Sequence, residues 1–239
     1  MQDKPKLRPG IHLETISVEK RILNENDRLA AANRQAFTGR GVCVLNLISS
    51  PGAGKTTLLV ETIKALQPVY RMAVIEGDQQ TDYDARRIAE TNVPVVQVNT
   101  GPACHLDARM IAQAVEHLSA AQPELFFIEN VGNLICPAEF DLGESAKVAI
   151  MSVTEGEEKP LKYPLVFHLA KALVITKTDL LPYLPFDLAR FTSNARQVNP
   201  VLEILQTSAL QPATLAPWLE WLHGLVQSAK GGAYNPPGE

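Results

Sequence analysis

A glycine-rich segment that joins an apolar run to a helix-forming run constrains the fold of this chain more than any other feature. Apolar residues dominate Val42–Ile48, the octapeptide Ser49-Ser50-Pro51-Gly52-Ala53-Gly54-Lys55-Thr56 follows, and Thr57-Leu58-Leu59 opens a helical pattern. A strand, a loop of this spacing and a helix start are the context in which a P-loop binds phosphate. The backbone N–H groups of such a loop point at the phosphates, and the helix start adds partial positive charge. We therefore predict a site for a nucleoside triphosphate and Mg²⁺ at this loop.

Individual residues of the loop have expected roles. Lys55 can reach the β- and γ-phosphates and is a predicted catalytic residue, and the Thr56 hydroxyl can ligate Mg²⁺. Ser49 stands where the usual pattern has its first glycine, a position that needs a small residue more than it needs glycine's backbone freedom. The loop residues expected to contact the nucleotide are Gly52, Ala53, Gly54, Lys55, Thr56 and Thr57.

Short apolar runs alternate with helical stretches after residue 41. Apolar runs without period-two alternation indicate strands buried on both faces, as in parallel sheets. This alternation predicts an α/β fold, a three-layer P-loop NTPase whose mostly parallel sheet is covered by helices on both faces. Helices are expected near 56–67, 83–91, 107–121, 187–197 and 214–229, and strands at Val42–Ile48, Met72–Ile75, Val93–Val98, Leu125–Ile128, Val148–Val153, Ala172–Ile175 and Val201–Leu205.

The chain divides into three predicted parts. Residues 1–40 form an N-terminal arm and a helix, with Ser17 as the N-cap and Gly39 as the stop signal. Residues 41–230 form the P-loop domain, and the Gly/Pro-rich residues 231–239 form a flexible tail. We expect the N-terminal helix to pack on the domain or on a partner.

Composition argues against several functional classes. The formal net charge of −4 argues against nucleic-acid binding, which needs a basic excess. No run approaches the roughly 18 consecutive apolar residues of a membrane span, and the segment Met1–Lys6 does not lead into the apolar core of a signal peptide. Three cysteines are too few for a disulfide framework. We therefore expect a cytoplasmic protein that binds neither nucleic acid nor membrane, with cysteines that are free thiols or metal ligands.

A second motif predicts which base is bound. Thr176-Lys177-Thr178-Asp179 follows the expected strand Ala172–Ile175, at the place where P-loop GTPases have Asn-Lys-x-Asp. The Asp179 carboxylate would accept hydrogen bonds from guanine N1–H and the 2-amino group, a pair of donors that adenine does not have. Thr176 replaces the usual Asn but leaves this carboxylate intact. A weaker signal follows the last expected strand, where a Ser-Ala backbone N–H would meet guanine O6. The sequence thus favours GTP over ATP, with base contacts from Lys177, Asp179, Ser208 and Ala209.

Acidic residues stand at the ends of two expected strands. Asp78 closes the Glu76-Gly77-Asp78 segment after one strand, and Glu129 directly follows another. The carboxyl ends of parallel strands meet at the sheet edge where the phosphate loop also lies. We expect Glu129 in the Mg²⁺ shell and Asp78 on Mg²⁺ or on the attacking water, both as catalytic residues. Gly132 is expected to contact the γ-phosphate through its backbone and to release it on hydrolysis.

Two thiols and an imidazole form a candidate transition-metal site. Cys104 and His105 lie between an expected strand and an expected helix, and Cys136 lies seven residues after Glu129. Thiolates and imidazole are good ligands for Zn²⁺ or Ni²⁺. Because three ligands leave one position open and adjacent Cys-His pairs also occur by chance, spacing alone leaves both a metal site and ordinary side chains as readings.

Several segments together resemble the HypB family, the GTPases that assist nickel insertion into [NiFe]-hydrogenase. The resemblance covers about residues 17–228, and its Gly-Pro-Ala-Cys-His-Leu-Asp and Glu-Asn-Val-Gly-Asn segments are the most specific. The segments that carry it are 49–59, Ile75–Thr81, Gly101–Asp107, Glu129–Pro137 and Val153–Pro164.

The resemblance implies roles that spacing alone does not. In that family the matched cysteines and histidine bind Zn²⁺ or Ni²⁺ near a GTP-dependent dimer interface, which assigns these roles to Cys104, His105 and Cys136. The resemblance also implies GTP hydrolysis to GDP and phosphate, and partners that include a nickel-binding accessory protein and the hydrogenase large-subunit precursor. Some members carry an N-terminal Cys-x-x-Cys-Gly-Cys site or a His-rich stretch. This chain has only His12 before residue 100, so N-terminal nickel storage is not expected.

Three alternatives remain open from the sequence. A related GTPase for another nickel enzyme, such as the urease type, would carry a Cys-Pro-His motif that is absent here. A P-loop kinase for small molecules would need an arginine-bearing lid and would not need Thr176–Asp179. A nucleotide-switch scaffold would use its cysteines only structurally. Within the polar segment Glu155–Tyr163, Lys159 and Lys162 could reach a partner's nucleotide, although a solvated loop is the preferred interpretation.

Overall fold

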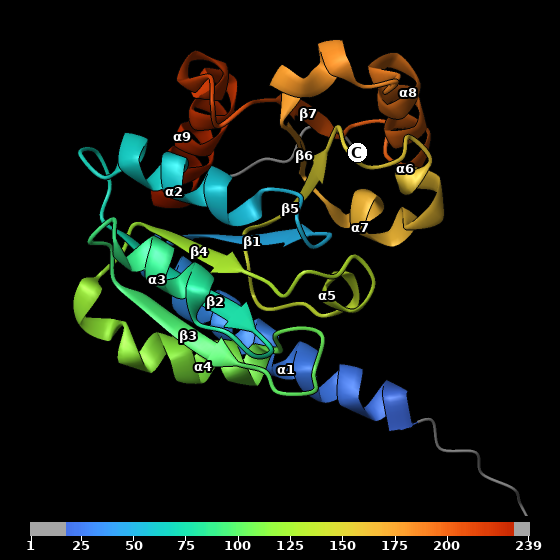
Figure 1. The fold of residues 1–239 in the computed structure, drawn as a ribbon. Coiled ribbons are helices and arrows are strands. Elements are labelled where there is room, and N and C mark those ends of the chain that lie inside the picture. Colours follow the sequence, from blue (N-terminus) through green and yellow to red (C-terminus); the bar gives the residue numbers. More distant parts are fainter. Residues whose placement is uncertain (1–17, 232–239) are drawn as a thin grey trace, which may run out of the picture.

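The computed structural model describes residues 18–231, which fold around a parallel sheet (Figure 1). This part of the chain has seven strands in the spatial order β3-β2-β4-β1-β5-β6-β7, and every neighbouring pair runs parallel. Because β1 lies centrally between β4 and β5, the loop that follows it opens at the middle of the carboxyl edge. The strands are β1 (Cys43–Ser49), β2 (Met72–Asp78), β3 (Val95–Asn99), β4 (Leu125–Glu129), β5 (Ala146–Ser152), β6 (Ala172–Thr176) and β7 (Glu203–Gln206).

Helices cover both faces of the sheet, as the sequence predicts. The helices α2, α3 and α9 pack on the face formed by alternate β1 residues such as Leu45 and Leu47. The opposite face packs on α1 and α4 at one end and on α7 and α8 at the other. No helix between residues 18 and 231 is long and apolar enough to cross a bilayer. The bounds are α1 (Val18–Thr38), α2 (Lys55–Leu66), α3 (Tyr83–Ala89), α4 (Ala108–His117), α5 (Cys136–Glu139), α6 (Lys159–Lys162), α7 (Pro164–Leu169), α8 (Leu188–Val198) and α9 (Ala216–Gly231), with 3₁₀ turns at Ser119–Ala121, Thr178–Tyr183 and Pro212–Leu215.

The predicted elements are present, and short helices are added to them. All seven expected strands form, with ends shifted by no more than three residues. The sequence does not predict α5, α6 or α7, because four to six residues are too few to show a helical period. Each of these helices has a proline in its first turn, where a missing N–H costs nothing.

The N-terminal helix α1 packs on α4 and on the chain before β5. Asn33 Nδ2 donates to the carbonyls of Ala108 at 2.9 Å and Leu142 at 3.1 Å, and Asn26 exchanges hydrogen bonds with this same region. Of the two expectations for this helix, packing on the domain is therefore what its described residues do. Its expected N-cap, Ser17, lies outside the described residues.

Candidate nucleotide and metal sites

The phosphate loop connects the central strand to α2. β1 ends at Ser49, and α2 begins at Lys55 with Gly54 as its N-cap. Gly54 has a φ of 90°, in the left-handed region that other residues avoid, so the turn requires glycine. No side chain caps the start of α2, which leaves its first backbone N–H groups available to an anion. This geometry is the one that a phosphate-binding loop needs.

Glu129, the last residue of β4, contacts the first turn of α2. Its Oε1 accepts hydrogen bonds from Lys55 Nζ at 2.7 Å and from Thr56 Oγ1 at 2.6 Å. The side chain is fully buried, and Oε2 has no hydrogen-bond partner among the described residues. Leaving a buried acceptor unsatisfied costs about 1–3 kcal/mol, and more for a charge. A carboxylate and a hydroxyl are oxygen ligands of the kind Mg²⁺ prefers, so these residues fit that ion.

Asp78 at the end of β2 organises the loop that follows it. Its Oδ1 accepts hydrogen bonds from the backbone N–H groups of Gln80 and Thr81, both at 2.7 Å. Burial acts to raise the pKa of Asp78, but these backbone bonds and the nearby Lys55 together lower it. The carboxylate is therefore ionised at neutral pH, as a ligand of Mg²⁺ or of its water would need to be.

Sequence reasoning assigned no role to Glu76, which lies beside Glu129 in the register of β2 and β4. Glu76 is 2% exposed, and its Oε2 has no partner in the described structure. Burial, with the charge of Glu129, raises the pKa of Glu76 to about 8. The sequence does contain a signal for this residue, because Glu76 is an acid directly after an apolar strand run and two positions before Asp78.

Lys55, Thr56, Glu76 and Asp78 line a cavity of about 570 Å³ at the carboxyl edge of the sheet. Gly132 lies against the phosphate loop here, because a Cβ at this residue would come within 3.1 Å of Pro51. A larger residue at this position would therefore require Pro51 to shift by a few tenths of an ångström. The predicted residues that line the cavity are Gly52, Ala53, Gly54, Lys55, Thr56, Thr57, Asp78, Gly132 and Lys177.

A second cavity of about 270 Å³ shares Gly54, Thr57 and Lys177 with the first. The other residues predicted to contact the base, Asp179, Ser208 and Ala209, line it. It thus extends the phosphate cavity toward the residues expected to read guanine.

Hydrogen bonds fix the base-side residues in place. Asp179 Oδ1 accepts a hydrogen bond from the Ser208 hydroxyl. Lys177 Nζ donates to the Gly52 carbonyl at 2.7 Å. Thr176, which replaces the usual Asn, donates its hydroxyl to the Ala53 carbonyl at 2.6 Å and so holds the phosphate loop from the same side.

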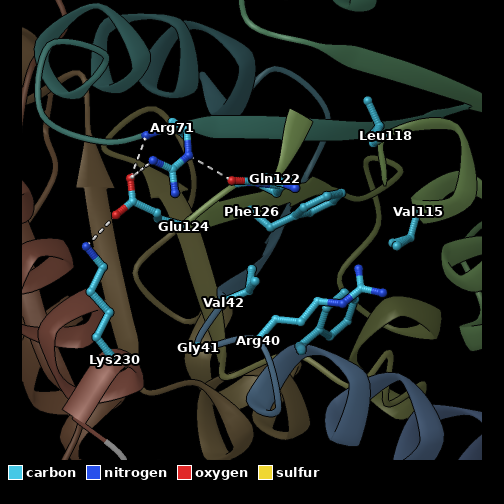
Figure 2. Close-up of a pocket in the computed structure, with 12 residues that line it drawn as sticks. Arg40, Gly41, Val42, Arg71, Val115, Leu118, Gln122, Glu124, Phe126 and Lys230 are labelled. Carbon is cyan, nitrogen blue, oxygen red and sulfur yellow. Dashed lines mark hydrogen bonds and ion pairs between the residues drawn. The ribbon is translucent and has the colours of Figure 1, made fainter. Parts of the chain in front are cut away.

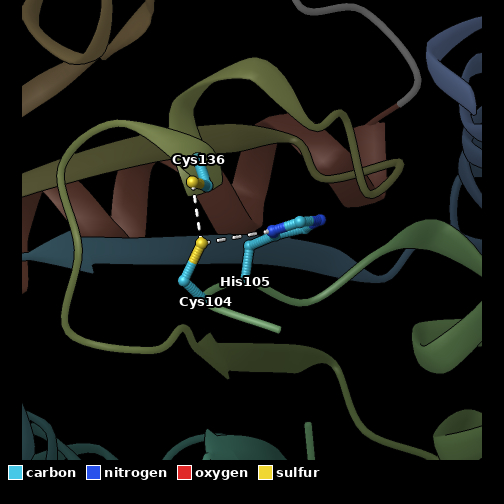
Figure 3. A group of neighbouring side chains, drawn as sticks. All are labelled: Cys104, His105 and Cys136. Atoms are coloured by element: carbon cyan, nitrogen blue, oxygen red, sulfur yellow. Dashed lines mark hydrogen bonds between the residues drawn. The ribbon is translucent and has the colours of Figure 1, made fainter. Parts of the chain in front are cut away.

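Cys104, His105 and Cys136 converge into one cluster (Figure 3). Their ligand atoms all lie within 4.8 Å of one another, with the two sulfurs 2.8 Å apart and His105 Nδ1 3.9 Å from Cys104 Sγ. The first two residues precede α4, and Cys136 is the first residue of α5. The spacing of these residues in the sequence did not decide whether they meet, and the fold brings all three together.

The protonation states in the cluster suit a soft divalent metal. Burial lowers the pKa of His105, so its imidazole is neutral at pH 7, the form that ligates metals. The hydrogen bond with Cys104, together with burial, raises the pKa of Cys136. Metal binding would therefore release protons from the thiols. The His105 ring packs on Phe140, with ring centroids 3.9 Å apart.

Asn130 is a further residue whose role the sequence did not reveal. It is fully buried between the two sites, and its Oδ1 accepts hydrogen bonds from the backbone N–H groups of Leu106 and Val131. Its amide nitrogen donates to Asn46 Oδ1 on β1 at 3.2 Å.

The interpretation of Glu155–Tyr163 as a solvated loop is wrong for Lys159. This residue begins helix α6, and its Nζ lies 3.0 Å from Ser50 Oγ of the phosphate loop and 3.1 Å from Glu155 Oε2. Lys162, in contrast, is exposed, and its Nζ lies 3.9 Å from Glu158.

A larger cavity, of about 740 Å³, lies at the opposite edge of the sheet (Figure 2). Lys230 and Arg71 both reach Glu124 there, with the Lys230 bond at 2.6 Å. Its lining residues Val42, Arg71 and Glu124 lie at or just before the amino ends of β1, β2 and β4. Size alone therefore does not mark the site, because none of the phosphate-loop residues lines this cavity.

Comparisons with known proteins agree with this geometry. The chain matches the family model of the CobW/HypB/UreG nucleotide-binding domain over residues 43–206. It is 56% identical over 215 residues to hydrogenase maturation factor HypB of Azotobacter chroococcum, covering 90% of this chain and 70% of the relative. It is 55% identical over 207 residues to HypB of Escherichia coli K12, covering 87% and 71%.

Solved structures give the same result. HypB from Helicobacter pylori in complex with nickel matches with a TM-score of 0.81 and 34% identity, covering 90% of this chain and 99% of that one. HypB from Archaeoglobus fulgidus matches with a TM-score of 0.79 and 33% identity, covering 85% and 99%. The sequence and the fold together show that this chain belongs to the HypB family of hydrogenase maturation factors.

Proposed function

We propose that this chain is a GTP-hydrolysing metallochaperone that binds Ni²⁺ or Zn²⁺ and assists nickel insertion into [NiFe]-hydrogenase. One observation carries the proposal: Cys136, one of the three residues of the metal cluster, lies on the segment that follows Glu129, and Glu129 contacts Lys55 and Thr56. A carrier whose metal affinity depends on nucleotide needs such an arrangement.

Hydrolysis would use the phosphate loop and the strand-end acids. Lys55 binds the β- and γ-phosphates, and Asp78 orients the attacking water. Thr56, Asp78 and Glu129 would hold Mg²⁺, which when bound offsets negative charge on the phosphates. Water adds to the γ-phosphorus, the bond to the β–γ bridging oxygen breaks, and its electron pair stays with GDP. Gly132 beside Pro51 supports a backbone contact to the γ-phosphate that is lost with phosphate release.

The base-side cavity supports GTP over ATP. Asp179 already accepts a hydrogen bond from Ser208 Oγ and stands beside Lys177 and Ala209. Guanine would offer this carboxylate two donors, whereas adenine would leave it without them.

The metal is the cargo of the protein. Two thiolates and one neutral imidazole leave at least one coordination position for another ligand. A second copy of the chain, meeting the first in a GTP-dependent homodimer, would supply it. The H. pylori relative is described in complex with nickel, and the other relatives are named hydrogenase maturation factors. We accordingly propose a nickel-binding accessory protein and the hydrogenase large-subunit precursor as partners in the cytoplasm.

Two measurements on the same purified protein test this proposal. We expect Mg²⁺-dependent phosphate release from GTP but not from ATP, and stoichiometric Ni²⁺ or Zn²⁺ binding that is lost in C104S/C136S while turnover remains. Equal turnover of ATP and GTP would contradict the proposed guanine selectivity and would favour the alternative of a P-loop kinase. If hydrogenase maturation stayed normal with C104S/C136S, the cysteines would have only a structural role and no role in metal delivery.

A further inference from the structure

Arg87 places a guanidinium in the phosphate cavity, and neither the sequence motifs nor the proposed mechanism uses it. Arg87 lies on α3, and its side chain lines the 570 Å³ cavity together with Lys55 and Asp78. Its Nη2 bonds Thr57 Oγ1 at 3.0 Å, and its Nη1 lies 3.3 Å from Asp84 Oδ1. The side chain is 33% exposed.

The neighbouring Arg86 provides an internal comparison. Its side chain is 75% exposed, pairs with Asp82 at 2.6 Å and does not line the cavity. α3 buries Ala85 and Ile88 toward the core, which turns Arg87 toward the start of α2 and Arg86 toward solvent. The two arginines therefore have the same chemistry but different orientations.

The charges around the cavity leave a use for this guanidinium. The cations that line it are Lys55, Arg87 and Lys177, and Lys55 is already paired with the buried Glu129 at 2.7 Å. Lys177 bonds the Gly52 carbonyl on the side of the base cavity. Arg87 is the cation placed beside the second threonine of the phosphate loop, where the α- and β-phosphates are cradled.

Of the two partners of Arg87, Thr57 at Nη2 is the one that a phosphate would replace, and Asp84 lies 3.3 Å from the other nitrogen, Nη1. Thr57 offers a neutral hydroxyl, whereas a phosphate offers charged oxygens that match the planar fork of a guanidinium. Hydrogen bonds to charged groups are about twice as strong as neutral ones. Thr57 and Arg87 both line the cavity, so a phosphate bound there would lie on the side that the guanidinium faces.

We propose that Arg87 is a catalytic residue that binds the β-phosphate within its own chain and stabilises the charge that gathers there during hydrolysis. When the bond between the γ-phosphorus and the bridging oxygen breaks, the electron pair moves onto the β-phosphate, and the guanidinium offsets that charge. This inference rests on the proposed GTP hydrolysis. It adds to that proposal a further catalytic residue, Arg87, and identifies the β-phosphate as the group that it binds.

The test compares R87A, R87Q and R87K with R86A as the matched control. We expect R87A to lower kcat for GTP at least about tenfold and to weaken GDP binding severalfold, because the ligand of the β-phosphate is lost. R87K should recover only part of kcat, and R86A should stay within about twofold of wild type. Free guanidinium ion, added at concentrations that leave the melting temperature unchanged, should partly restore R87A but not alter R86A.

The alternative interpretation is that Arg87 only links α3 to α2 and has no role in catalysis. R87A or R87Q with kcat within about twofold of wild type, whatever its melting temperature, would overturn the proposal. Gln can still donate to Thr57 but carries no charge, so R87Q decides the matter if R87A does not fold. If wild-type protein hydrolyses no GTP, the proposed function fails by itself, and GDP affinity of the same variants still tests whether Arg87 binds the β-phosphate.

Discussion

The side-chain oxygen of Asn130 accepts a hydrogen bond from the backbone N–H of Leu106 at 3.1 Å, and this bond joins the two sites. Asn130 directly follows Glu129, whose buried carboxylate contacts Lys55 and Thr56 of the phosphate loop, and Leu106 directly follows His105 in the metal cluster. Leu106 also packs on Gly77 of β2, where a Cβ would come within 2.8 Å of it. A shift of the segment after β4 therefore reaches the metal ligands through a buried contact.

Removing this amide should uncouple the sites. In N130A the Leu106 N–H loses its buried acceptor, so we expect a stability loss of about 1–3 kcal/mol. We also expect the Ni²⁺ affinity to become the same with GDP and with a non-hydrolysable GTP analogue, as measured by titration calorimetry. N26A is the matched control, because Asn26 Oδ1 accepts the N–H of Ala108 at 2.9 Å but has no contact with the nucleotide loop. A nucleotide dependence that survives in N130A would exclude this route.

Base selectivity should change with D179N. An Asn there replaces one of the two acceptors with a donor, which opposes guanine but matches the N1–H and O2 of xanthine. We expect affinity for GTP to fall at least about a hundredfold and XTP to become the better substrate. Steady-state phosphate release with both nucleotides measures this, with D187N, a change at the exposed N-cap of α8, as control. Unchanged GTP preference would mean that Asp179 does not read the base.

The sequence predicts the frame of the site because its signals are local. The phosphate loop, the strand ends and the Thr176–Asp179 motif are contiguous runs, and parallel strands bring their carboxyl ends to one edge without further information. Asp179 and Ser208 meet for this reason, since they follow the neighbouring strands β6 and β7.

The remaining contacts depend on tertiary packing and leave no local signal. Lys159 reaches Ser50 across 109 residues, and Arg87 reaches Thr57 across 30. Both pairings depend on how α6 and α3 pack in the folded domain, which no contiguous run of the sequence encodes. Glu76 differs, because the sequence shows an acid within an apolar strand but does not show that its buried Oε2 has no hydrogen-bond partner among the described residues.

The three cysteines should separate by reactivity. Cys43 is fully buried, and burial raises the pKa of its thiol to about 11, whereas Cys104 and Cys136 are half-buried. Reduced, metal-free protein should show two thiols that react with Ellman's reagent in the native state and a third only after unfolding. Ni²⁺ or Zn²⁺ should protect both reactive thiols, and C43A should retain them. Native-state reaction of Cys43 at the rate of the others, or no protection by metal, would contradict the site.

Stability of the protein without nucleotide and Mg²⁺ should fall as pH rises. The pKa of Glu76 is raised from 4.5 to about 8 by burial and by Glu129, so the folded state binds this proton more tightly than the unfolded state. The contribution is fully present below about pH 4.5 and is lost progressively up to about pH 8. Its upper limit is several kcal/mol, since one pKa unit corresponds to about 1.4 kcal/mol.

Thermal melts of wild type, E76Q and the exposed control E90Q between about pH 6 and pH 9 check this slope. We expect E76Q to melt above wild type at the alkaline end and to depend less on pH, and E90Q to follow wild type. Parallel curves for E76Q and wild type would show that Glu76 does not control the slope.

The central claim is that nucleotide state controls the metal site, and titration of wild-type protein with Ni²⁺ in the presence of GDP and of a non-hydrolysable GTP analogue tests it most directly. The contact of Asn130 with Leu106 predicts that the two affinities differ by at least about fivefold, and linkage requires Ni²⁺ to change the ratio of nucleotide affinities by the same factor. Equal Ni²⁺ affinities in the two nucleotide states would contradict the account.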